Sequence, residues 1–383
     1  MSELAFLRPI NEVSEREKFC AALAKGQTYE PQLQYEDPER ASEIRAACDE
    51  HLTGEFEALA RAVAQGIHRD YGSEENYCDA VWGRQLRDDE VDQHCHAYLT
   101  ENDLHGKCVF EWSPNVLVTM CGVPKQGPGK VRLVTRPNYY RETRLASLLD
   151  HEVGTHFVRS YNHRQSFAKG RPPFVHRTGW LLATEEGLAT LNTNKAYRDK
   201  RLWVPAIHYL GTLLASRLSF SKLWAELAKY IGENDHERLW TICLRVKRGI
   251  MDTGQPGGYY KDGSNFVGAI SLLRRRHAID FRLMHCVRTS IEDFPRAMAA
   301  AKVALQSGSV LLPSFVRDDA ALQLYHAALD ELAAANGIDQ PLPQGPAPPL
   351  TTTHRSSTQK TQAPKKVYCD GRAEIKTRLA INK

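Results

Sequence analysis

Two histidines and a glutamate form the stretch of this sequence that is best suited to chemistry. His151, Glu152 and His156 lie in a segment whose apolar residues recur at helical spacing. Imidazole nitrogens bind zinc, and a carboxylate beside them can accept a proton. Two histidines four residues apart lie about 40° apart around an α-helix, whereas five residues separate them by about 140°. The pattern therefore indicates a metal site on a helix that must be locally distorted.

A single π-turn is the distortion that fits this spacing. Such a turn absorbs one extra residue, and π-bulges are frequent at functional sites. Gly154, which lies between the two histidines, is the residue that most readily accepts an altered backbone. We therefore predict a π-bulge at about Gly154–Thr155. The shorter H-E-x-x-H motif is typical of zinc metallopeptidases, so the longer form predicts related chemistry with Glu152 as the general base.

A zinc site of this kind needs a third protein ligand and a position that stays open to water. The segment 179–190 is predicted as a second helix and carries two adjacent acids, Glu185 and Glu186. An acid followed by Gly, an apolar residue and Ala resembles the W-L-x-E-G-x-A helix that supplies the third ligand in several zinc aminopeptidases. This resemblance implies Glu186 as the ligand and directs Glu185 elsewhere. The reverse assignment remains open.

A wider resemblance rests on the same two segments. His-Glu-Val-Gly-Thr-His (151–156) and Thr-Glu-Glu-Gly-Leu-Ala (184–189) resemble the signatures of the microtubule-associated tyrosine carboxypeptidases, metallopeptidases that remove the C-terminal tyrosine of α-tubulin. Similarity extends over roughly residues 5–335. It implies a zincin-like fold with one zinc ion per chain, held by His151, His156 and Glu186. It also implies α-tubulin or microtubules as the partner, with the acidic tubulin tail as the substrate.

A carboxypeptidase needs a cation for the terminal carboxylate of its substrate, and arginine matches a carboxylate best. The candidates are Lys261 and four arginines near the metal helix, Arg132, Arg136, Arg141 and Arg144. Tyr260, or its neighbour Tyr259, could donate to the oxyanion of the tetrahedral intermediate. A basic rim that attracts an acidic tail is expected from Arg245, Lys247 and Arg248 or from Arg274–Arg276. The alternative for each is an ordinary surface cation or a packed aromatic ring.

Composition sets the class of protein. The chain has 383 residues, of which 42% are hydrophobic and 25% charged, as in soluble globular proteins. Its nine cysteines are scattered and predict reduced thiols. No apolar run reaches the roughly 18 residues of a membrane span, and no signal segment opens the sequence. We expect a cytoplasmic, cytoskeleton-associated monomer without a membrane partner.

The apolar spacing predicts a mainly α-helical protein of the α+β class, with a small β-sheet beside the metal-binding helix. The predicted strands are 115–121 and 130–134. The predicted helices are 14–25, a helical region 38–99 that breaks at Tyr71-Gly72, and 202–231, 234–248, 263–288, 292–306 and 318–335. We predict one metallopeptidase domain over residues 1–340, which opens with an arm at 1–35.

Residues 341–383 differ from the rest of the chain. They contain six prolines and eight Lys or Arg against two acids, which gives a net charge of +6. Such a segment has too few apolar groups for a core, so we predict a disordered tail. A basic tail can bind an anionic polymer such as a microtubule or a nucleic acid, or remain solvated without a partner.

Two other classes of function remain open. A metallopeptidase of different specificity would act on another acidic C-terminal tail, or as an amino- or endopeptidase. A catalytically inactive protein would bind microtubules or nucleic acid and keep the metal helix as a relic. An intact set of His151, Glu152, His156 and Glu186 favours an enzyme, because a relic would be free to lose Glu152.

Overall fold

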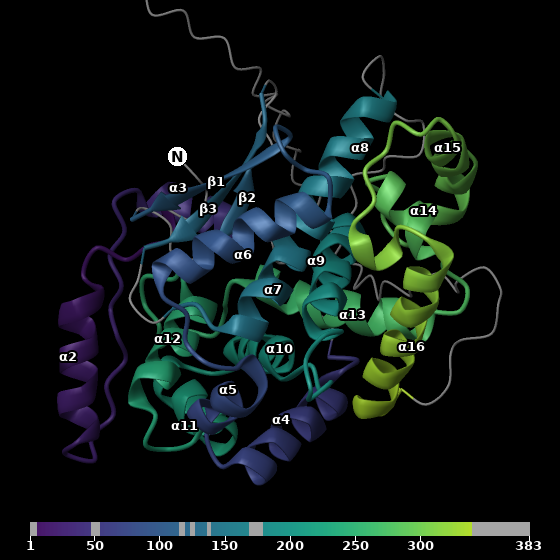
Figure 1. Cartoon of the computed structure of the whole chain (residues 1–383). Coiled ribbons are helices and arrows are strands. Elements are labelled where there is room, and N and C mark those ends of the chain that lie inside the picture. Colours follow the sequence, from purple (N-terminus) through teal and green to yellow (C-terminus); the bar gives the residue numbers. More distant parts are fainter. Residues whose placement is uncertain are drawn as a thin grey trace, which may run out of the picture. The chain divides into compact units, whose positions relative to one another are not determined.

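The computed structural model describes residues 6–46, 54–114, 119–122, 127–135, 139–167 and 179–338. Helices dominate these residues and accompany one three-stranded sheet (Figure 1). The prediction of a mainly helical α+β protein is therefore confirmed. None of the described helices is both long and apolar enough to cross a bilayer. The predicted tail, 341–383, and its boundary at residue 340 lie outside the described residues.

Among the described residues, five helices with defined bounds precede the sheet. They are α2 (Glu12–Leu23), α3 (Pro38–Ala46), α4 (Glu57–Tyr71), α5 (Glu74–Trp82) and α6 (Asp88–Glu101). The predicted break at Tyr71-Gly72 is confirmed, and its cause is local. Gly72 has a φ of +74°, which ends α4, and the Ser73 side chain accepts the Asn76 N–H to begin α5.

The sheet is formed by β1 (Cys108–Ser113), β2 (Met120–Gly122) and β3 (Gly129–Val134). Its order is β1-β3-β2; β3 runs parallel to β1 and antiparallel to β2. The strand predicted at 130–134 is confirmed. Of the segment 115–121, only the last two residues lie in a described strand, and 115–118 lie outside the described residues. β1 was missed because its sequence, Cys-Val-Phe-Glu-Trp-Ser, has no clear alternation of apolar and polar residues, and only Cys108 of the six is buried.

The segment with the two histidines forms one continuous rod. α7 (Glu142–His151) leads into the π-helix η2 (Glu152–Phe157), which continues as α8 (Val158–Phe167). In η2 the Val158 N–H donates to the carbonyl of Val153, five residues earlier, which is the hydrogen bond of a π-turn. The predicted π-bulge is confirmed, although it extends over six residues.

Helix α9 (Gly179–Asn194) carries the two adjacent acids, and the remaining elements follow it. These are α10 (Trp203–Ala215), α11 (Phe220–Ile231), α12 (His236–Lys247), the 3-10 turn η3 (Tyr260–Gly263), α13 (Ser264–Arg274), α14 (Phe281–Cys286), α15 (Phe294–Gln306), the 3-10 turn η4 (Ser314–Val316) and α16 (Asp319–Ala335). The prediction of one continuous helix over 263–288 was wrong, because the segment forms two helices, α13 and α14. Asp280 accepts the Leu283 N–H and caps a separate helix, α14.

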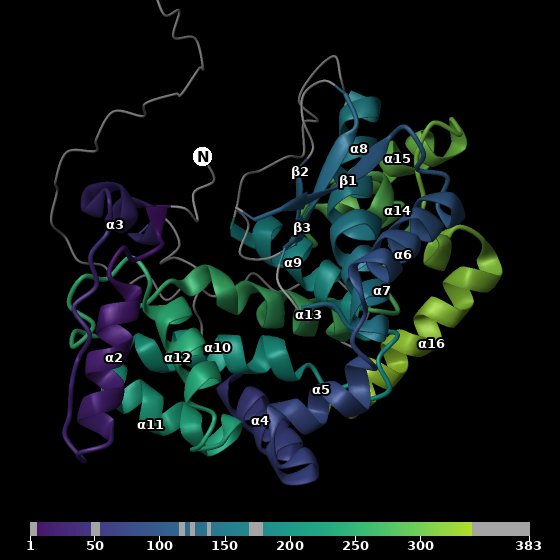
Figure 2. The same ribbon diagram turned by 60° about the vertical axis from the view of Figure 1, so that its left-hand side comes forward.

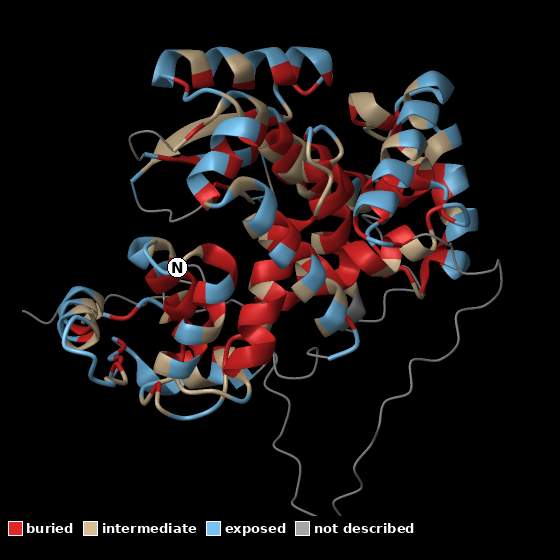
Figure 3. Cartoon of the chain, turned by 90° about the horizontal axis from the view of Figure 1, so that it is seen from below, coloured by how far each residue is buried: buried red, intermediate tan, exposed pale blue. Residues whose placement is uncertain are grey.

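Two apolar cores meet at the rod. The smaller core joins the sheet to α6, α7 and η2, and includes Val131, Leu133, Val153 and Phe157. The larger core includes Leu188 and Leu191 of α9 and most of the later helices. Figure 2 shows the sheet beside α7 and α8, and α10 and α13 on the side of the larger core. Figure 3 shows buried residues concentrated on the central helices. The rod and α9 therefore belong to different cores and meet at their boundary.

Candidate metal centre

Three potential ligand atoms gather where the rod meets α9. Glu186 Oε2 lies 4.0 Å from His151 Nε2 and 3.9 Å from His156 Nε2, and the three ligand atoms all lie within 4.8 Å of one another. Their side chains keep 19%, 22% and 24% of their surface exposed for His151, His156 and Glu186. Two imidazoles and one carboxylate are a donor set of catalytic zinc sites. The residues therefore fit a metal ion that a substrate can reach.

The π-turn is what brings the two histidines together. Five residues along a regular α-helix would place them about 140° apart. In η2 their ring centroids are 5.0 Å apart and the rings are nearly perpendicular, at 78°. The local distortion thus converts an unsuitable spacing into a pair of imidazoles that face one acid.

His151 is oriented by a residue of α9. The Thr193 hydroxyl donates to the Ala189 carbonyl at 2.9 Å and lies 3.0 Å from His151 Nδ1. Because the hydroxyl proton is already used in the bond to Ala189, His151 Nδ1 must carry a proton and donate it to the Thr193 oxygen. The other ring nitrogen, Nε2, then has a free lone pair on the side of Glu186. Burial, with the charge of His156, lowers the pKa of His151 to about 3, which keeps the ring neutral.

His156 is oriented by the other acid of α9. Its Nδ1 lies 3.5 Å from Glu185 Oε2, and Glu185 also forms an ion pair of 2.8 Å with the fully buried Arg159. Burial would raise the pKa of Glu185, but Arg159 and His156 outweigh it and lower the pKa to about 2. Burial would lower the pKa of His156, but the contact of its ring with Glu185 and the charge of Glu186 outweigh burial and raise this pKa to about 9. Glu185 therefore remains an anion behind His156, and only 3% of its side chain is exposed.

We expect the Glu185→Gln variant to bind zinc about 10- to 100-fold more weakly, because groups that orient a histidine ligand typically have this effect. The substitution keeps the shape of the side chain but leaves the Arg159 guanidinium without its anion. Competition with a chelator measures the affinity. Glu331→Gln, an exposed acid paired with Lys200 at 3.4 Å, is the matched control. Equal zinc affinity in both variants would contradict this role for Glu185.

Glu152 is held by the sheet. Its Oε2 accepts the Cys121 N–H of β2 at 2.8 Å, and the residue is 9% exposed. Burial raises the pKa of Glu152 to about 7, against the opposing effects of His156 and the Cys121 N–H. The small sheet lies beside the metal helix, as predicted, and fixes this carboxylate next to His151.

Close packing of α9 against α13 positions Glu186. A Cβ atom on Gly187 would overlap the backbone of Gly268, and one on Gly268 would overlap the Ala183 carbonyl oxygen. The two helices therefore approach at their backbones. This places Asn265 of α13 so that its Nδ2 donates to Glu186 Oε2 at 3.3 Å.

Comparison with known proteins gives evidence on function that is independent of the geometry of the metal centre. No family model matches the chain. The chain is 28% identical over 339 residues to microtubule-associated tyrosine carboxypeptidase 1 of Mus musculus, which covers 88% of the chain and 69% of the relative. The Homo sapiens protein of that name is 28% identical over 341 residues, with the same coverage. The putative tyrosine carboxypeptidase MATCAP2 of Mus musculus is 28% identical over 319 residues, 82% of the chain and 59% of the relative. The chain is therefore a homologue of the microtubule-associated tyrosine carboxypeptidases.

The residues predicted to bind substrate are distributed over different places in this homologue. Tyr260 and Lys261 lie in η3, directly before the helix that contacts Glu186. Arg132 is exposed on β3 and pairs with Glu111 at 3.0 Å, whereas its neighbours Val131 and Leu133 belong to the core that contains the metal helix. Since side chains alternate along a strand, Arg132 lies on the opposite face of the sheet. Arg136 lies outside the described residues.

Three other predicted cations are engaged away from the metal centre. Arg141 pairs with Asp79 at 2.6 Å, and Arg144 lies over the Trp82 ring at 4.2 Å. Lys247 is fully buried and donates to backbone carbonyls, including that of Gln255 at 2.8 Å, so it cannot belong to a basic rim.

Arg245, one of the cations proposed for a basic rim, lies near the site, and the sequence analysis missed only its partner, Asp262. Its guanidinium makes two hydrogen bonds to Asp262, at 2.8 and 3.0 Å. Burial would lower the pKa of Arg245, but the charges of Asp262 and Glu186 outweigh it and raise the pKa. Glu186 and Arg245 are far apart in sequence, so no local pattern relates them. Arg159, the buried partner of Glu185, was also missed, because it lies in the first turn of a polar helix, α8, in which one more cation carries no local signal.

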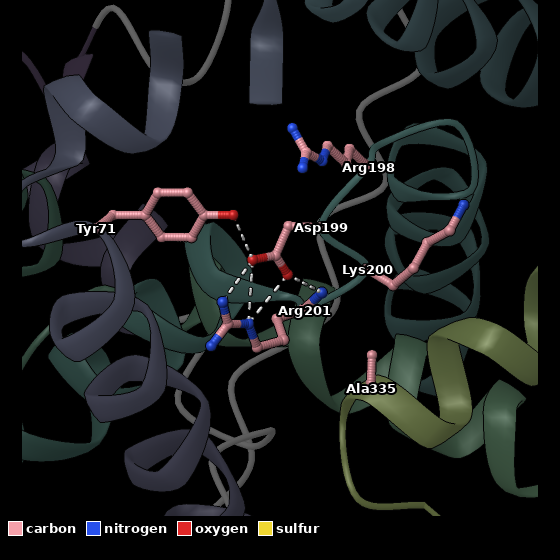
Figure 4. Close-up of a pocket in the computed structure, with 6 residues that line it drawn as sticks. All are labelled: Tyr71, Arg198, Asp199, Lys200, Arg201 and Ala335. Atoms are coloured by element: carbon pink, nitrogen blue, oxygen red, sulfur yellow. Dashed lines mark hydrogen bonds and ion pairs between the residues drawn. The ribbon is translucent and has the colours of Figure 1, made fainter. Parts of the chain in front are cut away.

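A separate surface hollow of about 430 Å³ follows α9 (Figure 4). It is lined by Tyr71, Arg198, Asp199, Lys200, Arg201 and Ala335. Asp199 accepts the Tyr71 hydroxyl at 2.9 Å and pairs with Arg201 at 2.5 Å. The hollow shares no residue with the metal centre, and its acid is already occupied by two partners.

Proposed function

We propose that this chain is a zinc carboxypeptidase that removes the C-terminal tyrosine of α-tubulin. The observation that carries the proposal is the convergence of His151, His156 and Glu186, with Glu152 held beside them. The names of its relatives, tyrosine carboxypeptidases, support this choice of reaction and substrate. We further propose a zincin-like catalytic domain over residues 1–340, a tail at 341–383 that binds the anionic polymer, and a monomer in the cytoplasm.

Each residue of the centre has a defined task. His151, His156 and Glu186 would hold the zinc ion. When bound, zinc lowers the pKa of a water molecule and polarises the scissile carbonyl. Glu152 accepts a proton from the attacking water and passes it to the leaving amine nitrogen as the C–N bond breaks. The Cys121 N–H occupies Oε2 of Glu152, so Oε1 is the oxygen that carries this proton.

The terminal carboxylate of the substrate would bind on the η3 side of the centre. Lys261 lies next to Asp262, which fixes Arg245 and, at 2.5 Å, Arg248. Two arginines therefore converge on Asp262, in the segment that also carries Lys261, and the charge of Glu186 acts on Arg245. Tyr260 is the proposed donor to the oxyanion. Arg132 does not belong to this group, because it lies on the far face of the sheet and pairs with Glu111.

Mass spectrometry of a synthetic α-tubulin tail after incubation with the full chain tests the proposal. We expect the loss of one C-terminal tyrosine, its disappearance after chelation, and its return when zinc is added. A tail with an amidated C-terminus is the control, since a carboxypeptidase needs the free carboxylate and an endopeptidase does not. Cleavage of the amidated tail would indicate an endopeptidase. No cleavage and no bound zinc would favour a binding protein.

A further inference from the structure

The π-turn between the two histidines has a cost that the rest of the fold must offset. π-helices are rare, and a turn that loosens the backbone disturbs the regular pairing of its carbonyl groups. In η2 the Thr155 side chain compensates for this locally. Its hydroxyl donates to the Asp150 carbonyl at 2.8 Å, five residues back, and the residue is fully buried. A side chain thus connects the residue before His151 to the residue before His156.

Asn192 of α9 joins this link to the helix of the third ligand. Its Nδ2 donates to Thr155 Oγ1 at 2.8 Å, and its Oδ1 accepts the Tyr325 hydroxyl at 2.7 Å. Thr155 therefore donates to one partner and accepts from another. Asn192 is also fully buried and lies six residues after Glu186. The bond fixes the distance and rotation between the π-turn and the helix that carries Glu186.

The direction of every hydrogen bond in this network is determined. His285 Nδ1 lies 2.7 Å from the Phe281 carbonyl, so it carries the proton, and Nε2 accepts the second N–H of Asn192 at 3.4 Å. Burial lowers the pKa of His285 to about 4, in agreement with a neutral ring. Asn192 therefore makes two donor contacts and one acceptor contact, with partners from η2, α14 and α16. Fully satisfied buried networks hold a single arrangement because each alternative leaves a polar group unpaired.

A second set of contacts fixes the other end of the π-turn. The Asp150 carboxylate accepts the Tyr98 hydroxyl at 2.9 Å and pairs with Lys195, which lies 4.1 Å from the Phe315 ring centroid. A Cβ atom on Gly154 would lie 2.8 Å from the same Tyr98 hydroxyl. The backbone of Asp150 is thus held by Thr155, and its side chain is held by Tyr98 of α6 and by Lys195, which directly follows α9.

We propose that Thr155 and Asn192 are positioning residues that hold the π-turn in register, so that His151 and His156 face Glu186. The inference rests on the proposed function, since it assigns these residues to the metal centre. Among the described residues, their side chains hydrogen-bond to groups other than the three ligand side chains, so they act through the backbone of η2 and through α9. Without the network, the turn can relax toward an α-helix, which moves the two imidazoles apart.

The test is the zinc affinity of the full chain, measured by competition with a chromogenic chelator. Thr155→Val keeps the shape and removes the hydroxyl; we expect zinc binding to weaken by at least 10-fold, while Thr155→Ser retains the wild-type affinity. Thr212→Val is the matched control, because Thr212 is also fully buried and its hydroxyl donates only to the Tyr209 carbonyl of its own helix, at 2.8 Å. Both Val variants should have lower melting temperatures in chelator, but only Thr155→Val should lose zinc affinity.

Three outcomes separate the inference from the proposed function. If the wild-type chain binds no zinc, the proposed function itself is wrong. If wild type binds zinc and Thr155→Val binds it equally well, the positioning role is overturned and the network supports only stability. If Thr155→Val does not fold, Tyr325→Phe decides, since it removes only the outermost hydroxyl. We expect several-fold weaker zinc binding in that variant, and unchanged affinity would overturn the inference.

Discussion

The Glu152→Gln variant is expected to lose tyrosine release by about 10³-fold or more while it keeps its zinc. General acid–base groups typically contribute about 10²- to 10⁴-fold to a reaction rate. Glutamine has the size of glutamate, and its side-chain oxygen can still accept the Cys121 N–H that now holds Oε2 at 2.8 Å. What it loses is the ability to take up a proton at the second oxygen. The three proposed ligands, His151, His156 and Glu186, are unchanged.

Two measurements on the same sample check this expectation. Mass spectrometry of the tubulin tail gives the rate of tyrosine release, and elemental analysis gives the zinc content. Glu142→Gln is the matched control, because Glu142 begins the same rod but is 51% exposed and lies 3.8 Å from Arg84. Full activity in Glu152→Gln would show that another group is the base. Loss of zinc together with activity would show that Glu152 instead supports the metal site.

Gly268→Ala is expected to reduce the free energy of unfolding by about 3 kcal/mol, at the upper end of what overpacked cores lose. The new methyl group would overlap the Ala183 carbonyl oxygen and lie 2.9 Å from the Gly187 Cα. These neighbours are backbone atoms of α9, so no side chain can move aside. Relief requires α9 and α13 to separate, which would displace Glu186 from the histidines and Asn265 from Glu186.

Urea unfolding measures this loss, and zinc affinity should fall in the same variant. Gly66→Ala is the matched control, also a helical glycine, whose added Cβ would meet only the tip of the Arg201 side chain, at 3.0 Å. There the gain in helix propensity, about 1 kcal/mol, offsets the small contact. A loss below about 1 kcal/mol in Gly268→Ala would show that α9 and α13 can separate without cost.

Features that depend on neighbouring residues were predictable from the sequence. The spacing of His151 and His156 by itself required a distorted helix, because the geometry of an α-helix allows no other way for both to reach one ion. The break between α4 and α5 was equally local, since Gly72 and Ser73 supply its two caps. The periodic apolar residues likewise predicted most helices and the strand at 130–134. Whether a predicted helix is continuous was harder to judge. Asp280, which caps α14, lay inside the predicted helix 263–288, and a residue type that caps helices also occurs within them.

Features that depend on packing between distant segments were decided only by the tertiary structure. Glu185 and Glu186 are adjacent and chemically identical, so their directions depend on the rotation of α9, which is fixed by the contact of Gly187 with Gly268 of α13, a residue outside the motif. The side of the sheet that Arg132 occupies follows from which face the apolar core covers. The partnership of Arg245 with Asp262, and of Asn192 with Thr155, joins residues with no local relation in the sequence. The sequence by itself determined which side chains could bind a metal and the local distortion they need. Only the packing of α9 against η2 and α13 decided which of them meet.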